Sequence, residues 1–327
     1  MLNRRMQVSL ALVAGLALAA GIAAHAGLPA VMAVLGRLGA GELAWLCAQQ
    51  MGSVLLCGWA WWIFTQGASF VACAAARFVR DGTSSVLAIV PGMGEVAGMR
   101  ALTLFGARAG NAAGSGVVDL ATEILAQVLF TLAGLVALVA VLGRAELHHA
   151  AAIAAATLLP LVVIYAACRS TGVRGALTRL VARLKQRFGL ARWQLGVDAM
   201  QTVGALWRDR PRLAAGTLIH LAAWMLAALQ IWYAAQALDS PLMPLSALAL
   251  AAIVHAARGA LFVVPWGAGV QEVGFVVAGA ALGLDEPTAI AMSLAFRVRD
   301  TLLALPALLL WAVAELREVW LARKVAS

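Results

Sequence analysis

Long apolar runs separated by short polar stretches are the dominant pattern along this sequence. An α-helix needs about twenty apolar residues to cross a hydrocarbon core of roughly 30 Å, and several runs reach that length. The pattern therefore predicts an all-α fold, a polytopic integral membrane helix bundle that forms a single transmembrane domain over residues 1–327. About seven spanning helices are expected, near residues 8–33, 43–65, 112–142, 150–168, 213–238, 246–263 and 287–314.

Two further stretches, residues 83–108 and 264–283, are apolar but interrupted by proline and glycine. Proline removes a backbone donor and glycine tolerates positive φ, so both residues can end a helix inside the membrane. We therefore predict two re-entrant segments that enter the membrane and turn back. The alternative is that the glycines only allow helices to pack closely. The candidate helix breakers are Pro91, Gly92, Gly94, Pro265, Gly267 and Gly269.

The two interrupted stretches resemble each other, which suggests an internal repeat. Each contains Val-Pro, nearby glycines and then a glutamate, Glu95 in the first and Glu272 in the second. A second acid follows each glutamate after the same 28 residues, at Glu123 and Asp300. A duplicated unit explains this spacing, and chance similarity in a chain rich in alanine and glycine is the alternative. The two halves would cover about residues 43–142 and 213–314, joined by the loop 169–212.

Composition indicates that the chain lies in lipid, and the distribution of charge predicts its orientation in the membrane. Hydrophobic residues make up 63% of the chain and charged residues 12%, which indicates lipid as the solvent. The loop 169–212 carries ten Arg and Lys residues against two Asp residues. By the positive-inside rule, this loop, the predicted loop 66–82 and both termini face the cytoplasm of a bacterial inner membrane. The first run is expected to remain as an uncleaved helix, although the small residues around His25 also resemble a signal-peptidase site.

Ionisable residues within the apolar stretches are the candidate functional residues. A charge at the bilayer centre costs about 2.5–3.5 kcal/mol, so we expect these residues to pair with one another in a polar cavity. Asp119 and Glu123 project from one helix face, and Arg258 could bridge toward Glu272. An ion-pair network with a purely structural role is the alternative. The candidates are Glu95, Arg100, Asp119, Glu123, Arg258, Glu272, Arg297, Arg299 and Asp300, with Arg108 as a further embedded charge.

No cofactor, metal or catalytic motif is evident in the sequence. The four cysteines lack metal-ligand spacing, the histidines form no motif, and no phosphate-binding loop is present. The basic residues lie beside predicted spans and show no nucleic-acid-binding motif, so nucleic acid is not an expected partner. The sequence therefore predicts neither metal nor cofactor, and an enzymatic activity is not expected.

Three stretches carry a family resemblance. Residues 89–95 (Ile-Val-Pro-Gly-Met-Gly-Glu), residues 117–123 (Val-Val-Asp-Leu-Ala-Thr-Glu), and the segment from Val264 to Arg297 resemble the transmembrane, flippase-like region of lysylphosphatidylglycerol synthases. The chain looks like a stand-alone form, most similar to the hopanoid-biosynthesis-associated branch. It departs from the family pattern at Trp266, where glycine is more usual, and in the late position of Arg100.

The resemblance implies membrane lipid translocation, with a hopanoid or phospholipid as substrate and lipid-biosynthesis enzymes as possible partners. No aminoacyl-transferase domain follows the last predicted span, so synthase activity is not expected. The alternatives are an intramembrane lipid-modifying enzyme and a non-catalytic accessory or scaffold of a lipid-biosynthesis complex.

Overall fold

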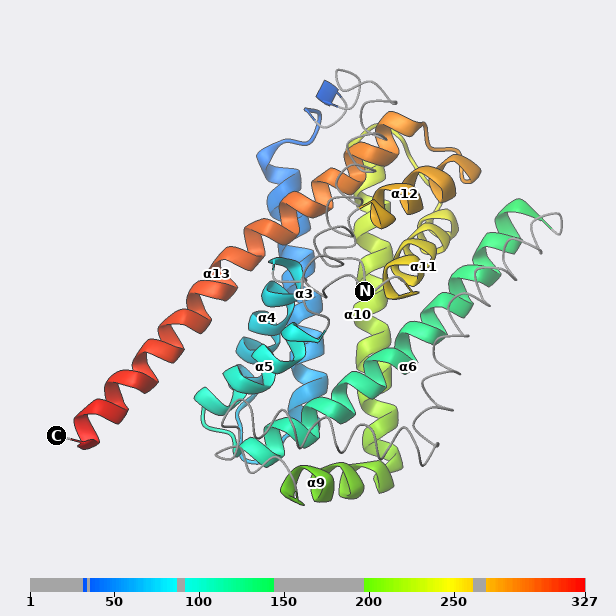
Figure 1. The fold of residues 1–327 in the computed structure, drawn as a ribbon. Coiled ribbons are helices and arrows are strands. Elements are labelled where there is room, and N and C mark those ends of the chain that lie inside the picture. The colour runs from blue at the N-terminus through cyan, green and yellow to red at the C-terminus, as the bar shows by residue number, and fades with distance from the viewer. Residues whose placement is uncertain (1–31, 34–35, 87–91, 144–196, 261–268, 327) are drawn as a thin grey trace, which may run out of the picture.

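The computed structural model describes residues 32–33, 36–86, 92–143, 197–260 and 269–326, and the elements within these ranges are helices (Figure 1). The all-α prediction is therefore confirmed for the described residues. The helices are α3 (Ala40–Phe64), α4 (Phe70–Val86), α5 (Met93–Leu104), α6 (Ala109–Leu142), α9 (Val197–Arg208), α10 (Arg210–Ala237), α11 (Pro244–Ala260), α12 (Val270–Ala281) and α13 (Glu286–Ala326).

Five helices begin within three residues of the predicted start of a span: α3, α6, α10, α11 and α13. Two of them, α6 with 34 residues and α10 with 28, are both long and apolar enough to cross a membrane. The predicted spans 8–33 and 150–168 lie outside the described residues, apart from residues 32–33. The predicted number of seven spans is therefore not tested.

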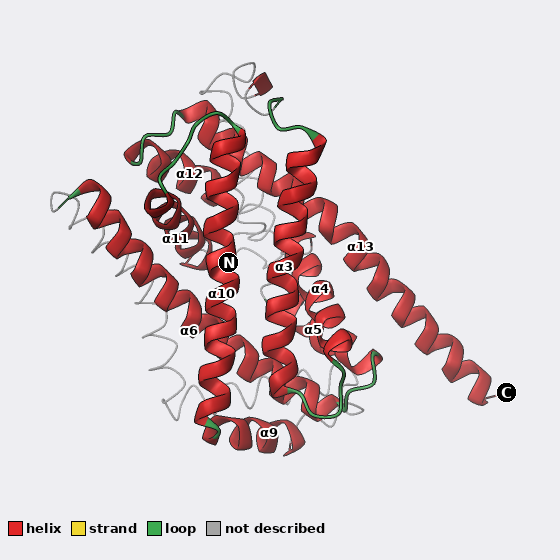
Figure 2. Ribbon diagram, turned by 180° about the vertical axis from the view of Figure 1, so that it is seen from behind, coloured by secondary structure: helices red, strands yellow, loops and turns green. Residues whose placement is uncertain are grey.

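Helices α3 and α10 pack side by side, in front of the other helices in Figure 2, and the colours of Figure 1 show that they run in opposite directions. The rings of Trp45 and Tyr233 meet edge to face at one end of the pair, with centroids 6.4 Å apart. At the other end, a Cβ at Gly216 would overlap the ring of Phe64, so the absent side chain allows close packing there. This pair supplies a scaffold against which the remaining helices are arranged.

A correction concerns residues 66–82, which were predicted to be a loop. Most of them belong to helix α4, which packs against α3, α5 and α13. Arg77 and Arg80 lower the hydropathy of this segment, yet both are buried and paired with carboxylates. Mean hydropathy counts the charge of each arginine but contains no information about the carboxylate that pairs with it. The segment was therefore predicted to be a loop.

The interrupted stretch 83–108 contains the end of α4 and all of α5, and the stretch 264–283 contains α12; we call α4 with α5, and α11 with α12, the two hairpins. Gly92 precedes α5 with φ 82°, and Gly269 precedes α12 with φ 78°. Both angles are at positive φ, which glycine adopts without steric strain, so each of these candidate helix breakers lies at the start of a helix. Gly94 is not a break, because it lies inside α5, where a Cβ would overlap Ser84 of α4. Pro91, Pro265 and Gly267 lie outside the described residues.

The described helices fall into two series of matching lengths. Helices α4 and α11 each have 17 residues, and α5 and α12 each have 12 residues. Each hairpin follows a long helix, α3 or α10, and precedes another, α6 or α13. The last helix of each series packs against the hairpin of the other series, α6 on α11 and α13 on α4.

Candidate functional site

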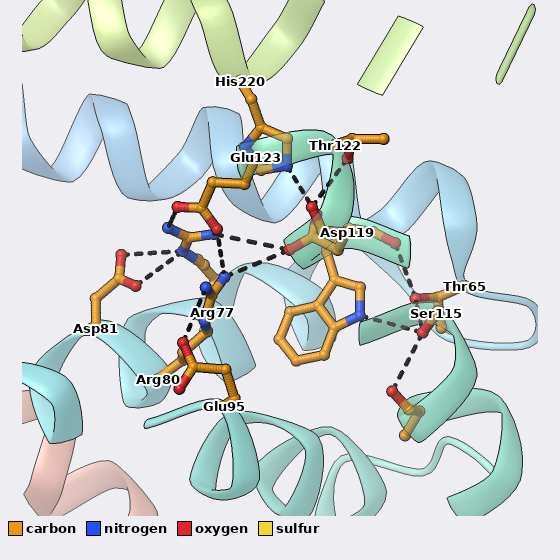
Figure 3. Close-up of polar contacts among 12 residues, drawn as sticks. Thr65, Arg77, Arg80, Asp81, Glu95, Ser115, Asp119, Thr122, Glu123 and His220 are labelled. Carbon is orange, nitrogen blue, oxygen red and sulfur yellow. Dashed lines mark hydrogen bonds and ion pairs between the residues drawn. The ribbon is translucent and has the colours of Figure 1, made fainter. Parts of the chain in front are cut away.

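A first set of charged residues links α4 to α6, with contributions from α5 and α10 (Figure 3). Arg77 Nη2 lies 2.6 Å from Glu123 Oε1, and Arg80 Nη1 lies 2.8 Å from Glu123 Oε2. The two arginines are one helical turn apart on α4, so both reach the same face of α6. We call the set the α4–α6 cluster; its members are Arg77, Arg80, Asp81, Glu95, Asp119, Glu123 and His220.

Asp119 is the most enclosed acid of this cluster, with 1% of its surface exposed. One carboxylate oxygen, Oδ1, lies 3.0 Å from Nε2 of His220, which is fully buried on α10. The other, Oδ2, lies 3.5 Å from Arg80 Nη1 and 3.7 Å from Arg77 Nη1. A neutral His220 donates its Nε2–H to Asp119, which leaves Nδ1 as an acceptor. That Nδ1 has no hydrogen-bond partner among the described residues.

The α4–α6 cluster has more negative than positive charge. Arg77 Nε lies 2.9 Å from Asp81 Oδ1, and Arg80 Nη2 lies 3.2 Å from Glu95 Oε1. The four carboxylates therefore share two guanidinium groups, and with neutral His220 the formal charges, −4 and +2, sum to −2. Asp119 and Glu123 are the more enclosed acids, and negative charge is unfavourable in a medium of low dielectric constant, so their surroundings favour a further positive charge.

A second set of charges lies on α11, α12 and α13. Arg297 Nε lies 2.6 Å from Glu272 Oε1, and its Nη2 donates to Oε2 at 3.0 Å. The backbone N–H of Gly269 donates to the same Oε2 at 2.9 Å, so Glu272 also caps the start of α12. Ser293 Oγ donates to Oε1 at 3.3 Å. Glu272 is thus held by the arginine, a hydroxyl and the backbone of its own helix.

Arg299 and Arg258 extend this second set toward α10. Arg299 Nη2 lies 2.7 Å from Asp300 Oδ1, and its Nη1 donates to Oε1 of Gln230. Arg258 and Arg299 line a cavity of about 40 Å³. We call this set the α12–α13 cluster; its members are Arg258, Glu272, Arg297, Arg299 and Asp300, and their formal charges, +3 and −2, sum to +1.

The structure separates residues that the sequence was expected to bring into one cavity. Glu95, Asp119 and Glu123 belong to the α4–α6 cluster, and no ion pair among the described residues joins the two clusters. Asp119 and Glu123 do project from one helix face, as predicted. The expected partner of Glu272 was wrong, because Arg297 and not Arg258 pairs with it. Arg100 belongs to neither cluster and pairs with Glu315 of α13 at 2.8 Å.

Four residues of the α4–α6 cluster were missed in the sequence: Arg77, Arg80, Asp81 and His220. The three on α4 lay in the segment assigned to a loop. Their signal was present, since Arg77 and Asp81 are four residues apart, the spacing at which side chains meet on a helix. His220 carried no signal, because its partner Asp119 is 101 residues away along the chain.

Two hollows lie near the connection between α3 and α4. A polar pocket of about 610 Å³ includes Arg108, Asn111 and Asp198 in its lining, from α6 and α9 and the residue before α6. An apolar groove of about 550 Å³ is lined by residues of α3, α4 and α10, among them Trp62 and Phe70. A polar hollow and an apolar hollow therefore both adjoin the α3–α4 connection.

Comparison with known proteins gives one match. The sequence model of a family described as the lysylphosphatidylglycerol synthase TM region matches residues 6–307. No curated protein and no solved structure matches the chain.

Proposed function

The chain belongs to the family of the lysylphosphatidylglycerol synthase TM region, and on this premise we propose that it translocates a lipid between the leaflets of the bacterial inner membrane. The proposed substrate is a hopanoid or a phospholipid, whose polar headgroup crosses inside the bundle while its apolar part stays in the bilayer. The family and the apolar helices support a membrane protein with a lipid-related role. Translocation is the further step that we propose.

The observation that carries the proposal is the placement of two polar clusters at different positions along α10. His220 touches the α4–α6 cluster and Gln230 touches the α12–α13 cluster. Ten residues of helix separate them, which corresponds to roughly 15 Å along the axis. A headgroup passing from one cluster to the other would exchange polar partners in two steps and would avoid the full cost of entering hydrocarbon.

We further propose that the chain is multi-pass, with seven spans, and that its two helix series arose by duplication. The equal hairpin lengths and the glycine before α5 and α12 support a duplication. The opposite directions of α3 and α10 support an inverted arrangement of the two units (Figure 1). Inverted repeats with interrupted helices are a recurrent architecture of membrane transporters, and their substrate sites lie between the repeats.

The two hollows beside the α3–α4 connection fit an amphiphilic molecule. In the proposed route, the headgroup first occupies the polar pocket between Arg108 and Asp198, and the apolar part lies in the groove beside Trp62 and Phe70. Helix α9 lines the polar pocket and belongs to the basic segment 169–212, which the positive-inside rule assigns to the cytoplasm. The proposed route therefore starts at the cytoplasmic leaflet.

Reconstitution in liposomes tests the proposal directly. Fluorescent hopanoid and phospholipid analogues are followed by the fraction that a membrane-impermeant quencher can reach. We expect Glu272→Gln and Arg297→Ala to reduce translocation at least tenfold, because each removes one partner of the ion pair at the centre of the α12–α13 cluster, the second polar cluster of the proposed route. Arg100→Ala is the matched control, since it breaks an ion pair outside both clusters, and it should translocate at close to the wild-type rate.

Each outcome of this experiment is informative. Unchanged lipid distribution with the wild-type protein, for every lipid class, contradicts translocation. A lipid product of altered mass would instead favour the alternative of a lipid-modifying enzyme. Equal loss of folded protein in the Glu272→Gln and Arg297→Ala variants would favour a purely structural role of that ion pair.

A further inference from the structure

Three potential metal ligands from three different helices converge beside the α4–α6 cluster. They are Cys57 of α3, Glu123 of α6 and His220 of α10, and their ligand atoms all lie within 4.8 Å of one another. Among the described residues, this is the one group of three or more such side chains. The spacing along the chain gives no hint of the site, which is why the sequence predicted no metal.

His220 is the side chain that points most directly to a ligand. It is fully buried, and its Nδ1 has no hydrogen-bond partner among the described residues. Its other nitrogen, Nε2, is held 3.0 Å from Asp119. Histidines that bind metals commonly donate their second ring N–H to a carboxylate, which fixes the tautomer and orients the ring. The contact of His220 with Asp119 has this arrangement (Figure 3).

The charge of the surroundings favours a cation at the same place. The α4–α6 cluster carries a formal charge of −2 even after Arg77 and Arg80 are counted. Cys57 binds a metal as its thiolate and releases its proton to water, so one divalent cation beside Glu123 and Asp119 would bring the formal charge from −2 to −1. Glu123 already accepts from both arginines, but two carboxylate oxygens offer about four lone-pair sites, so an oxygen can bond an arginine and a metal together.

We propose that Cys57, Glu123 and His220 bind one divalent ion of the zinc class. A sulfur, an imidazole nitrogen and a carboxylate oxygen are the ligand types that Zn²⁺ prefers, and three protein ligands leave a fourth position for water. The ion would join α3 and α6 of the first helix series to α10 of the second, and so restrict their relative motion. The inference rests on the convergence of these side chains and is independent of lipid translocation.

Metal content of the full chain, purified in detergent without added metal, is the first test. We expect about one zinc per chain in the wild-type protein by elemental analysis. Cys57→Ser should lower zinc binding at least tenfold, and His220→Ala should abolish it. Cys73→Ser is the matched control, because Cys73 is equally buried but lies outside the group, and it should keep the wild-type metal content.

Cobalt substitution provides a second measurement, which reports on the metal–thiolate bond itself and not on the amount of bound metal. After chelation, Co²⁺ bound through Cys57 should give the near-ultraviolet charge-transfer absorption of a cobalt–thiolate bond in the wild type and in Cys73→Ser. Cys57→Ser, checked as a monodisperse species, should lack that band. Failure of the wild type to take up either Zn²⁺ or Co²⁺ overturns the proposal, as does a Cys57→Ser variant with unchanged uptake and spectrum.

Discussion

The α4–α6 and α12–α13 clusters occupy comparable places in the two helix series. They differ in formal charge and in whether a cavity adjoins them. The first has a formal charge of −2, and its acids share two arginines through several contacts each. The second has a formal charge of +1 and borders a cavity of about 40 Å³. The same arrangement of a hairpin and a long helix thus supports a closed, acid-rich network in one series and an arginine-rich one beside a cavity in the other.

The difference indicates how each cluster tolerates change. In the first cluster, each arginine serves several acids, so loss of one arginine leaves several buried charges without a partner. In the second, acids and arginines are matched nearly one to one, and each loss is local. Substitutions at equivalent positions of the two series therefore test whether the clusters differ in their tolerance of change.

The largest effect is expected for Arg77→Met in the α4–α6 cluster. This change leaves Asp81 without its described ion-pair partner and raises the negative excess around Asp119 and Glu123. Breaking a buried ion pair in this way costs about 3–5 kcal/mol, so the yield of folded protein and the thermal midpoint should fall sharply. Arg100→Met is the control, since both partners of its ion pair are about one-third exposed, and it should lower stability by less than about 1 kcal/mol.

An intermediate effect is expected from alanine in the two hairpins. A Cβ at Gly98 would lie 2.8 Å from Cβ of Arg80, whereas a Cβ at Gly274 would lie 3.5 Å from Val254, an ordinary contact. Gly98→Ala should therefore destabilise the protein by about 1–3 kcal/mol, because α4 and α5 must move apart. Gly274→Ala should be neutral or stabilise α12 by up to about 1 kcal/mol, since alanine favours helix. Thermal midpoints in one detergent compare the two variants, and equal midpoints would contradict the expected difference in packing.

The smallest effect is expected for the paired changes Asp300→Asn and Asp81→Asn. The two carboxylates are similarly enclosed, with side chains 22% and 28% exposed. Asp300→Asn removes the acid from Arg299 and should cost about 1 kcal/mol, because an arginine-rich cluster loses a negative charge. Asp81→Asn should stay within about 0.5 kcal/mol, since Arg77 keeps Glu123 and the acid excess falls. A larger loss for Asp81→Asn would show that the formal charge of each cluster does not govern its stability.

Local pattern predicted the fold class and the starts of five helices, because apolar runs report directly on burial in lipid. Gly92 and Gly269 could be proposed as helix breakers because glycine close to proline in the sequence has a local conformational meaning. Helix α4 was not recognised, since its arginines are buried through partners on α5 and α6 that a window of sequence does not contain. The division of the candidates into two clusters depends on tertiary packing and had no sequence signal. Arg258 and Arg297 illustrate this, because both are arginines near Glu272 and only the fold decides which one pairs.

Because α13 lies against α4, and α6 against α11, each series holds down the hairpin of its counterpart. A tilt of α6 would therefore weaken its contact with α11, and a tilt of α13 would weaken its contact with α4. This reciprocal packing links the two series mechanically, so a substitution that displaces α6 or α13 should also alter the hairpin of the other series.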